Sequence, residues 1–169
     1  MPMANPRWTL RPAEEQDLDA LARLAGALVR MHHDFDPQRF FLPEQVEKGY
    51  RGWFARELRD DDAILLTATL DCALAGYVYG RLEERDWNLL LERHAALHDL
   101  WVEEPARRSG IAEGLVEAFA EAARRRGAPR IVLTTAASNT RAQAVFERLG
   151  FRRTMVEMTR ELSGPNSGR

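Results

Sequence analysis

The chain has 169 residues, of which 45% are hydrophobic and 30% charged, and its formal net charge is −2. The length fits one domain with a substantial core. The slightly acidic net charge argues against a nucleic-acid binder, which needs a basic surface. No apolar run is long enough to cross a bilayer, so we expect no membrane partner, and no signal peptide is visible. The single cysteine, Cys72, indicates a reducing cytoplasm, and Lys48 as the only lysine is a usage common in GC-rich bacteria.

Apolar periodicity predicts alternating helices and strands along a single domain, residues 7–162, followed by a polar tail at 163–169. Helical segments carry apolar residues three and four positions apart, and strand segments are short apolar or alternating runs. The turn Asp71–Cys72 lacks the usual hairpin glycine, which leaves its geometry open. In chain order we predict a strand at 7–13, helices at 14–32 and 43–58, strands at 64–70, 73–82 and 96–102, a helix at 110–126, a strand at 131–135, a short helix capped by Ser138 or Asn139, and a last strand within 151–162.

The stretch ARRSGIAEGL, residues 106–115, places two arginines and a glycine between a strand and a helix. Cations at a helix N-terminus oppose the macrodipole, so a bound anion would explain Arg107 and Arg108. The first N–H groups of a helix bind phosphate, and Gly110 lets the backbone approach such a ligand closely. The alternative is a solvated basic turn before an ordinary helix, and this stretch alone leaves both interpretations open.

Three segments, in the same order, resemble the GCN5-related N-acetyltransferase (GNAT) superfamily. Arg107, Gly110 and Ala112 fit the acyl-CoA loop of that family, after a strand HDLWV that resembles its fourth strand. NTRAQAVFERLGF, residues 139–151, resembles the Asn-initiated helix that ends in Gly-Phe, and residues 7–21 resemble the opening strand and helix. The resemblance implies an α/β (α+β) fold with a mixed, mostly antiparallel sheet of six to seven strands, splayed central strands and about four flanking helices.

The resemblance also implies acetyl-CoA as donor and direct acetyl transfer to an amine, with no covalent enzyme intermediate. The pantetheine arm would bond to a strand backbone, the pyrophosphate would bind the loop backbone and its two arginines, and the Asn-initiated helix would contact the arm. The residues assigned to the donor in this way are Leu100, Trp101, Val102, Arg107, Arg108, Ser109, Gly110, Ile111, Ala112, Asn139, Ala142 and Phe146.

An amine attacks a thioester only when it is neutral, so a general base is required. The strand LHDLWV resembles that of polyamine acetyltransferases, with His98 in place of their glutamate, and histidine titrates near neutral pH. We therefore expect His98 to be the base, with Asp99 and Glu83 as reserves; a packed strand histidine is the alternative. Strand alternation predicts that His98 shares a face with Leu100 and Val102.

Many members of the family protonate the leaving thiolate with a tyrosine on the Asn-initiated helix, and this chain has Phe146 at that position. Tyr77 or Tyr79 could replace that donor, water could act, or the thiolate could leave unprotonated. The departure also leaves a second hypothesis open, an acyl-CoA-binding sensor or interaction module with weak catalysis.

In this family the loop between the first two helices lines the acceptor pocket, and here it reads MHHDFDPQRF. We expect Asp34 or Asp36 to bind a cationic amine, with Phe35 and Tyr79 also at the substrate; a plain turn at Asp36 is the alternative. The prediction is acetylation of a primary amine on a small cationic molecule, or else of a protein N-terminus or lysine.

The histidines and the apolar cluster at residues 87–91 are the two remaining features of the sequence. The four histidines have no supporting Cys or carboxylate spacing, so we expect no metal site. The apolar cluster at residues 87–91 is interpreted as core or lid packing, with a contact in a homodimer as the alternative.

Overall fold

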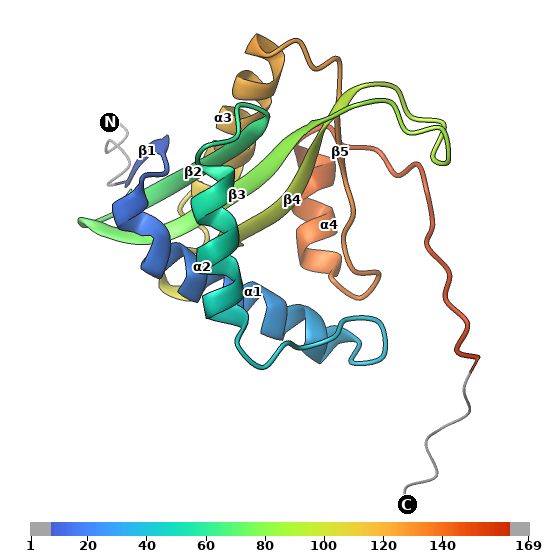
Figure 1. Ribbon diagram of the computed structural model, residues 1–169, viewed down its shortest axis with the longest axis horizontal. Coiled ribbons are helices and arrows are strands. Elements are labelled where there is room, and N and C mark those ends of the chain that lie inside the picture. The colour runs from blue at the N-terminus through green and yellow to red at the C-terminus, as the bar shows by residue number, and fades with distance from the viewer. Residues whose placement is uncertain (1–7, 163–169) are drawn as a thin grey trace, which may run out of the picture.

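The computed structural model describes residues 8–162, which form a five-stranded sheet with helices on both faces (Figure 1). The strands lie in chain order, β1-β2-β3-β4-β5, and all neighbours are antiparallel except β4 and β5. The elements are β1 (Trp8–Pro12), α1 (Leu18–Phe35), α2 (Val46–Glu57), β2 (Ala63–Leu70), β3 (Ala73–Glu83), β4 (His94–Val102), α3 (Ile111–Arg125), β5 (Ile131–Leu133) and α4 (Thr140–Arg148), with 3₁₀ turns at Glu15–Asp17 and Glu104–Ala106. The predicted fold class is confirmed.

Alternation along β3 divides the core into two layers. Tyr77 and Tyr79 are fully buried in the layer under α1 and α2, whereas Val78 and Leu82 belong to the layer that packs on α3. Figure 1 shows α1 and α2 in front of the sheet and α3 behind it. Among the described helices, none is both long and apolar enough to span a membrane.

Helix α1 runs to Phe35, beyond the end expected from the spacing. Asp36 then adopts an extended backbone, φ −157°, and its carboxylate accepts hydrogen bonds from the N–H groups of Gln38 and Arg39, at 3.1 and 3.2 Å. The turn interpretation of Asp36 is therefore confirmed. Asp34 and Phe35 belong to the last turn of the helix, so the expectation that they lie in a loop is wrong.

The β2–β3 hairpin turns through Asp71 and Cys72, both in the left-handed region at φ 49° and 66°. Two successive left-handed residues form the turn whose twist suits a two-residue hairpin. Aspartate tolerates this conformation through its short polar side chain, which accounts for the first of the two positions; Cys72 adopts it as a strained residue.

The part of the chain between residues 8 and 162 has five strands, so the expected six to seven are not found there. The segment 151–162, expected to contain the last strand, has no strand, and residues 152–162 are exposed throughout. A strand needs a hydrogen-bonded neighbour to be stable, and no described strand pairs with this segment.

Candidate active site

A β-bulge and a strand separation meet at His98. In the β3–β4 ladder Tyr79 pairs with Asp99 and Gly80 with Leu97, so His98 is an inserted residue. On the opposite side, the parallel pairing of β4 with β5 ends at Leu97. The central strands therefore part at the residue that bulges, which confirms the expected splay.

Gly80 explains why the chain can bulge at this position. A Cβ atom here would lie 2.2 Å from the carbonyl oxygen of Ala96 and 2.6 Å from the ring of Phe119. No side chain fits into that space, so glycine is needed for β3, β4 and α3 to approach this closely.

The bulge reverses the alternation expected along β4. Leu100 and Val102 pack in the α3 layer, and Trp101 packs in the layer under α1 and α2. The imidazole of His98 stacks on Tyr79 in that second layer, with 5.7 Å between ring centroids. The expected grouping of His98 with Leu100 and Val102 is wrong, because one inserted residue moves every later side chain to the opposite face.

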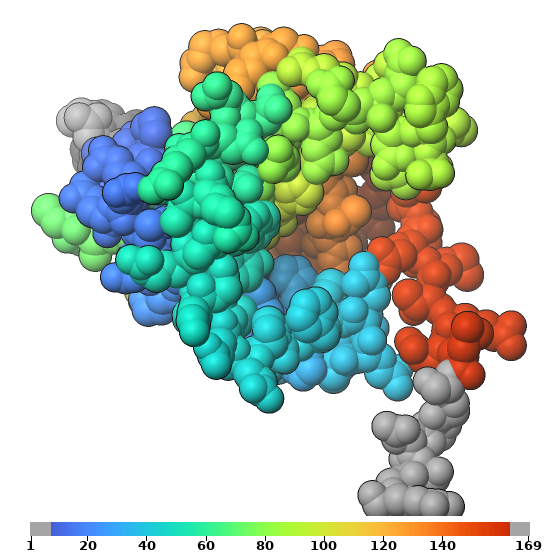
Figure 2. All heavy atoms as spheres, in the orientation of Figure 1, coloured from blue at the N-terminus to red at the C-terminus, as the bar shows by residue number. Residues whose placement is uncertain are grey.

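A cavity opens where β4 and β5 separate, and Figure 2 shows a hollow there, between the lime β3–β4 connection, the blue and cyan end of α1 and the orange α4. Its mostly apolar lining is typical of a small-molecule site. Of the predicted site residues it brings together His98, Leu100, Asn139, Ala142 and Phe146. The full lining is Leu28, Met31, His32, Leu97, His98, Leu100, Leu133, Thr134, Thr135, Asn139, Ala142 and Phe146.

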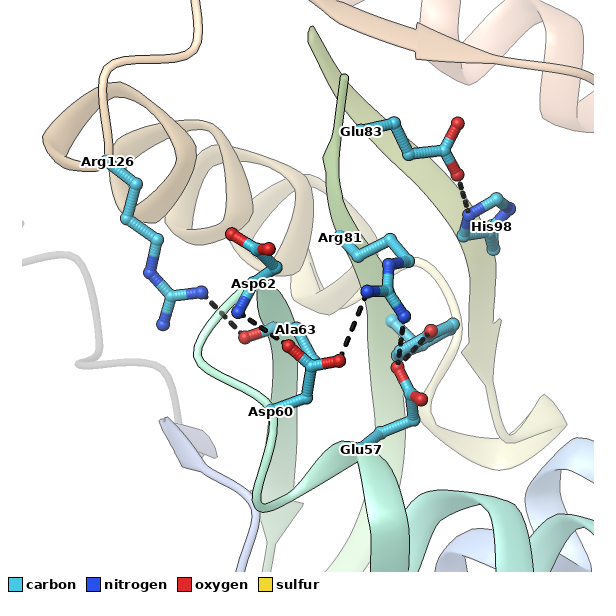
Figure 3. A network of polar contacts seen from close by, with 9 residues as sticks. Glu57, Asp60, Asp62, Ala63, Arg81, Glu83, His98 and Arg126 are labelled. Carbon is cyan, nitrogen blue, oxygen red and sulfur yellow. Dashed lines mark hydrogen bonds and ion pairs between the residues drawn. The ribbon is translucent and has the colours of Figure 1, made fainter. Parts of the chain in front are cut away.

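Glu83 holds the imidazole of His98 at the cavity (Figure 3). The Nε2 atom of His98 lies 3.0 Å from Oε1 of Glu83, and the side chains are 41% and 40% exposed, so solvent reaches both. A hydrogen bond from Nε2–H to the carboxylate leaves the lone pair on Nδ1, which is the tautomer a base requires. The other carboxylate oxygen lies 3.6 Å from Nε2 of buried His94. Although two histidines approach Glu83, no group of three side chains that could hold a metal ion is found between residues 8 and 162.

Asp99, the second candidate base, is buried beside Tyr77 and does not line the cavity. The Tyr77 hydroxyl donates to Oδ2 of Asp99 at 3.0 Å. Burial raises the pKa of Asp99 to about 6, although the hydrogen bond from Tyr77 acts in the opposite direction.

Tyr77 and Tyr79 do not present free hydroxyls to the cavity. The hydroxyl of Tyr77 bonds to Asp99, and that of Tyr79 donates to Oε2 of Glu57 at 2.6 Å. Burial raises the pKa of both phenols. Tyr79 is fully buried and contacts the ring of His98, so the expected direct contact of Tyr79 with an acceptor does not match its position.

The connection from β4 to α3 presents a row of unpaired backbone donors. Among residues 8–162, no backbone oxygen accepts a hydrogen bond from the N–H groups of 108–113. Arg108 and Gly110 are left-handed, at φ 63° and 84°, and Gly110 directly precedes α3. Successive N–H groups in such a turn form an anion-binding concavity, to which the helix N-terminus adds positive potential. The loop residues assigned to a pyrophosphate therefore have suitable geometry.

Side chains fix the shape of this loop. The indole Nε1 of Trp8 donates to the carbonyl of Ser109 at 3.0 Å. The Nε atom of Arg107 donates to the carbonyl of Val102 at 3.0 Å, and its guanidinium lies 5.1 Å from the ring centroid of Trp101. Arg107 is thus anchored through Nε, while its two terminal nitrogens have no hydrogen-bond partner in the part of the chain that the structure describes. They remain available to an anion.

Helix α4 begins as the sequence predicts. The Oδ1 atom of Asn139 accepts a hydrogen bond from the N–H of Ala142 at 3.1 Å, which is the expected N-cap. Phe146, four residues after Ala142 on the same helix, is buried and lines the cavity. No tyrosine belongs to the cavity lining formed by the described residues.

Helix α1 lines the cavity through Leu28, Met31 and His32, which sequence reasoning did not assign to the site. Asp34 is exposed and does not line it, and the Phe35 ring lies against His32, 6.2 Å between centroids. The helical spacing from Leu28 to Phe35 was a signal that this face continues past the expected helix end. Leu97, Leu133, Thr134 and Thr135 were also missed, although the end of a parallel strand is a usual place for a site.

The β3–β4 connection, residues 84–93, projects from the body of the domain (Figure 1). Trp87, Leu89 and Leu90 are 72%, 59% and 85% exposed at its tip. The interpretation of this cluster as core packing is wrong, and none of these side chains lines the cavity.

Comparison with known proteins matches residues 28–151 to the Acetyltransferase (GNAT) family. A mutant of the BH1408 protein from Bacillus halodurans superposes with a TM-score of 0.79 at 22% identity, over 92% of this chain and 99% of that chain. The aminoglycoside N-acetyltransferase AAC(6′)-Iy in complex with CoA has a TM-score of 0.73 at 19% identity, over 96% and 99% of the two chains. A probable acetyltransferase has a TM-score of 0.70 at 25% identity, over 93% and 99%. No curated protein sequence matches.

The family match spans the cavity at the separated strands, the loop before α3 and the start of α4. The resemblance predicted from ARRSGIAEGL and NTRAQAVFERLGF is therefore confirmed. The chain belongs to the acetyltransferase (GNAT) family, whose members are N-acetyltransferases with acetyl-CoA as the acyl donor.

Proposed function

We propose that the protein transfers the acetyl group of acetyl-CoA directly to a primary amine on a small cationic molecule. The observation that carries this proposal is the position of His98, which is held by Glu83 at the cavity where β4 and β5 separate. The fold is shared with AAC(6′)-Iy, solved with CoA and with the bisubstrate analogue CoA-S-monomethyl-acetylneamine. This supports a donor and an amine acceptor meeting in one cavity.

The donor is held by backbone more than by side chains. Between residues 8 and 162, no strand pairs with the β5-facing edge of β4 beyond Leu97, so the pantetheine arm takes hydrogen bonds there along Leu100–Val102, as a neighbouring strand would. The pyrophosphate binds the unpaired N–H groups of 108–113 at the start of α3. The free terminal nitrogens of Arg107 and the exposed Arg108 add charge-assisted bonds.

His98 acts as the general base. Its Nδ1 atom accepts a proton from the ammonium group of the acceptor, and the carboxylate of Glu83 stabilises the imidazolium that forms. The neutral amine then attacks the thioester carbonyl, so that a C–N bond forms and the C–S bond breaks. The second amine proton passes through a water molecule to the departing thiolate, so that collapse of the tetrahedral intermediate gives the amide and the CoA thiol. The relay runs through water because Phe146 cannot donate a proton.

The acceptor site favours a small amine that carries further positive charge. Leu28 and Met31 form an apolar wall from α1, and Glu83 places negative charge beside the reacting end. Asp34, exposed on the last turn of α1, adds negative charge to the helix that lines the cavity. Free, exposed Cys72 fits a reducing bacterial cytoplasm.

A second candidate function is an acyl-CoA sensor with little turnover. It is favoured by Phe146 in the cavity wall and by the engagement of the Tyr77 and Tyr79 hydroxyls with carboxylates. Saturable binding of acetyl-CoA without amine acetylation would identify the sensor.

The base assignment is tested with His98→Gln against His33→Gln, a histidine outside the cavity lining. Loss of a general base lowers the rate by about 10²–10⁴-fold, so we expect His98→Gln to lower kcat by at least 100-fold with unchanged affinity for acetyl-CoA. His33→Gln should keep the native rate. A native kcat in His98→Gln would overturn the assignment.

A further inference from the structure

The sheet itself does not fix the direction of the His98 side chain, because His98 is the inserted residue of the bulge and has no partner in the ladder. Its contact with Glu83, at 3.0 Å, lies where solvent reaches both side chains. An exposed contact of this kind holds a side chain only weakly. A general base must keep its lone pair directed at the proton it takes, so His98 needs a second, buried support.

The ring of Tyr79 provides this buried support. Tyr79 is fully buried, and the imidazole of His98 stacks on its ring, with 5.7 Å between centroids and 25° between the planes. Offset stacking at this separation is a favoured arrangement of aromatic rings. Because Tyr79 pairs with Asp99 in the ladder, its ring comes from the strand position beside the bulge. Tyr79 is therefore the platform on which the imidazole rests.

The end of helix α2 fixes the Tyr79 ring in turn. The hydroxyl donates to Oε2 of Glu57 at 2.6 Å, and the indole of Trp53 packs edge-on against the phenol, with 4.8 Å between centroids. Glu57 is only 8% exposed, and Nη1 of Arg81 lies 3.3 Å from the same Oε2 atom. Arg81 also binds Asp60 at 3.1 Å (Figure 3). This network of contacts ties α2 to the candidate base.

The carboxylate of Glu57 also affects the charge that Tyr79 presents to His98. A phenol that donates to a carboxylate makes a strong, charge-assisted hydrogen bond, which leaves its oxygen and ring richer in electrons. The face of an aromatic ring is negative, and a cation over that face is attracted to it. When His98 accepts a proton, the imidazolium lies beside this face. The stacked ring therefore favours the protonated product of the base over the neutral imidazole.

We propose that Tyr79, anchored by Glu57, is a positioning residue for the general base. Its ring holds the imidazole of His98 beside Glu83, so that Nδ1 is directed at the acceptor amine, and it stabilises the imidazolium that forms. This inference rests on the proposed role of His98 as the base. It gives Tyr79 a part in the reaction that requires neither a free hydroxyl nor contact with a substrate.

Two substitutions at Tyr79 test the proposal in steady-state kinetics. Tyr79→Leu removes the platform and should lower kcat about tenfold, with the KM for acetyl-CoA unchanged. Tyr79→Phe keeps the ring but loses the anchor, so its kcat should lie between those of Tyr79→Leu and the native protein. Tyr50→Leu is the matched control, because it removes a ring that packs on Trp53 and should keep the native kcat. A native kcat in Tyr79→Leu, or an equal loss in Tyr50→Leu, would overturn the proposal.

The His98→Gln background tests whether Tyr79 acts through His98. In that background Tyr79→Leu should lower the residual kcat no further, since a residue that acts through another has no effect in its absence. An equal loss in both backgrounds would show a purely structural effect and contradict the proposal. Tyr79→Phe, which keeps the core filled, serves the same comparison if the leucine variant unfolds.

The imidazole nitrogen chemical shifts of His98 provide a measurement that needs no turnover; the signals missing in His98→Gln assign them. We expect a single tautomer, protonated at Nε2, in the native protein and mixed tautomers in Tyr79→Leu and Tyr79→Phe. The native tautomer in both variants would overturn the positioning role, whether or not any amine is acetylated. A native protein that shows this dependence on Tyr79 but acetylates no amine would instead contradict the proposed function.

Discussion

Gly110→Asp is expected to abolish tight binding of acetyl-CoA while leaving the fold intact. Gly110 has φ 84° and a Cβ there would meet nothing closer than 3.9 Å, at the Trp8 ring, so the new side chain fits but its backbone is strained by about 1–2 kcal/mol. A carboxylate about 5 Å from one phosphate charge costs about 3 kcal/mol at an effective dielectric constant of about 20. The dissociation constant should therefore rise by roughly 100-fold or more.

Gly127→Asp provides the matched control, since Gly127 follows the other end of α3 at φ 79°. It carries the same backbone strain and the same added charge, but lies away from the N-terminal donors. Calorimetric titration with acetyl-CoA should give native affinity for Gly127→Asp and loss for Gly110→Asp. If Gly110→Asp bound within about threefold of native, the row of N–H groups would not be the pyrophosphate site.

Trp8→Phe removes the 3.0 Å hydrogen bond to Ser109, worth about 1 kcal/mol; acetyl-CoA binding should weaken about fivefold with kcat unchanged, and native affinity in titration would mean that the loop keeps its shape unaided. The raised pKa of Asp99, about 6 against 3.8 for the free side chain, means that the folded state keeps a proton which the unfolded state loses. Asp99 should therefore contribute a loss of roughly 3 kcal/mol in the free energy of unfolding as pH rises from about 4 to about 6, whereas Asp17, whose pKa is lowered by Arg11, contributes in the opposite direction. Urea unfolding of native protein and Asp99→Asn at both pH values should show this loss as the difference between them; an equal pH dependence would contradict it. Asn139→Ala loses the 3.1 Å cap to Ala142, so calorimetry should show a Tm lower by about 2–4 °C, and an unchanged Tm would refute that role.

Features set by neighbouring residues could be predicted from the sequence. The N-cap at Asn139 and the glycine before α3 follow from local backbone chemistry, and both occur where expected. The hairpin at Asp71–Cys72 was also predicted, although the conformation of its turn required the structure.

The bulge at His98 could not be predicted, because it depends on contacts between segments far apart in the sequence. A glycine is needed at position 80 because Ala96 and Phe119, from β4 and α3, approach its backbone closely. The bulge then moves every later side chain of β4 to the opposite face. The contact of His98 with Glu83 could not be predicted either, because the strand register places Glu83 opposite His94 and not opposite His98. Strand alternation alone therefore gave the wrong face.

The segment after α4 shows a different limit. Its alternation correctly describes a strand pattern, but a strand also needs a partner, and residues 8–162 of the same chain supply none. A pattern in one sequence cannot tell whether its partner strand lies in the same chain or in another.

Release of the CoA thiol from acetyl-CoA, measured over a panel of small polycationic primary amines, tests the central claim most directly. The acetyl-CoA concentration is set from calorimetry so that the site is saturated. We predict that at least one amine gives saturable turnover and an acetylated product, and that neutral amines of the same size react more slowly. Saturable acetyl-CoA binding with no release above the amine-free rate for any amine would contradict the account and identify a sensor.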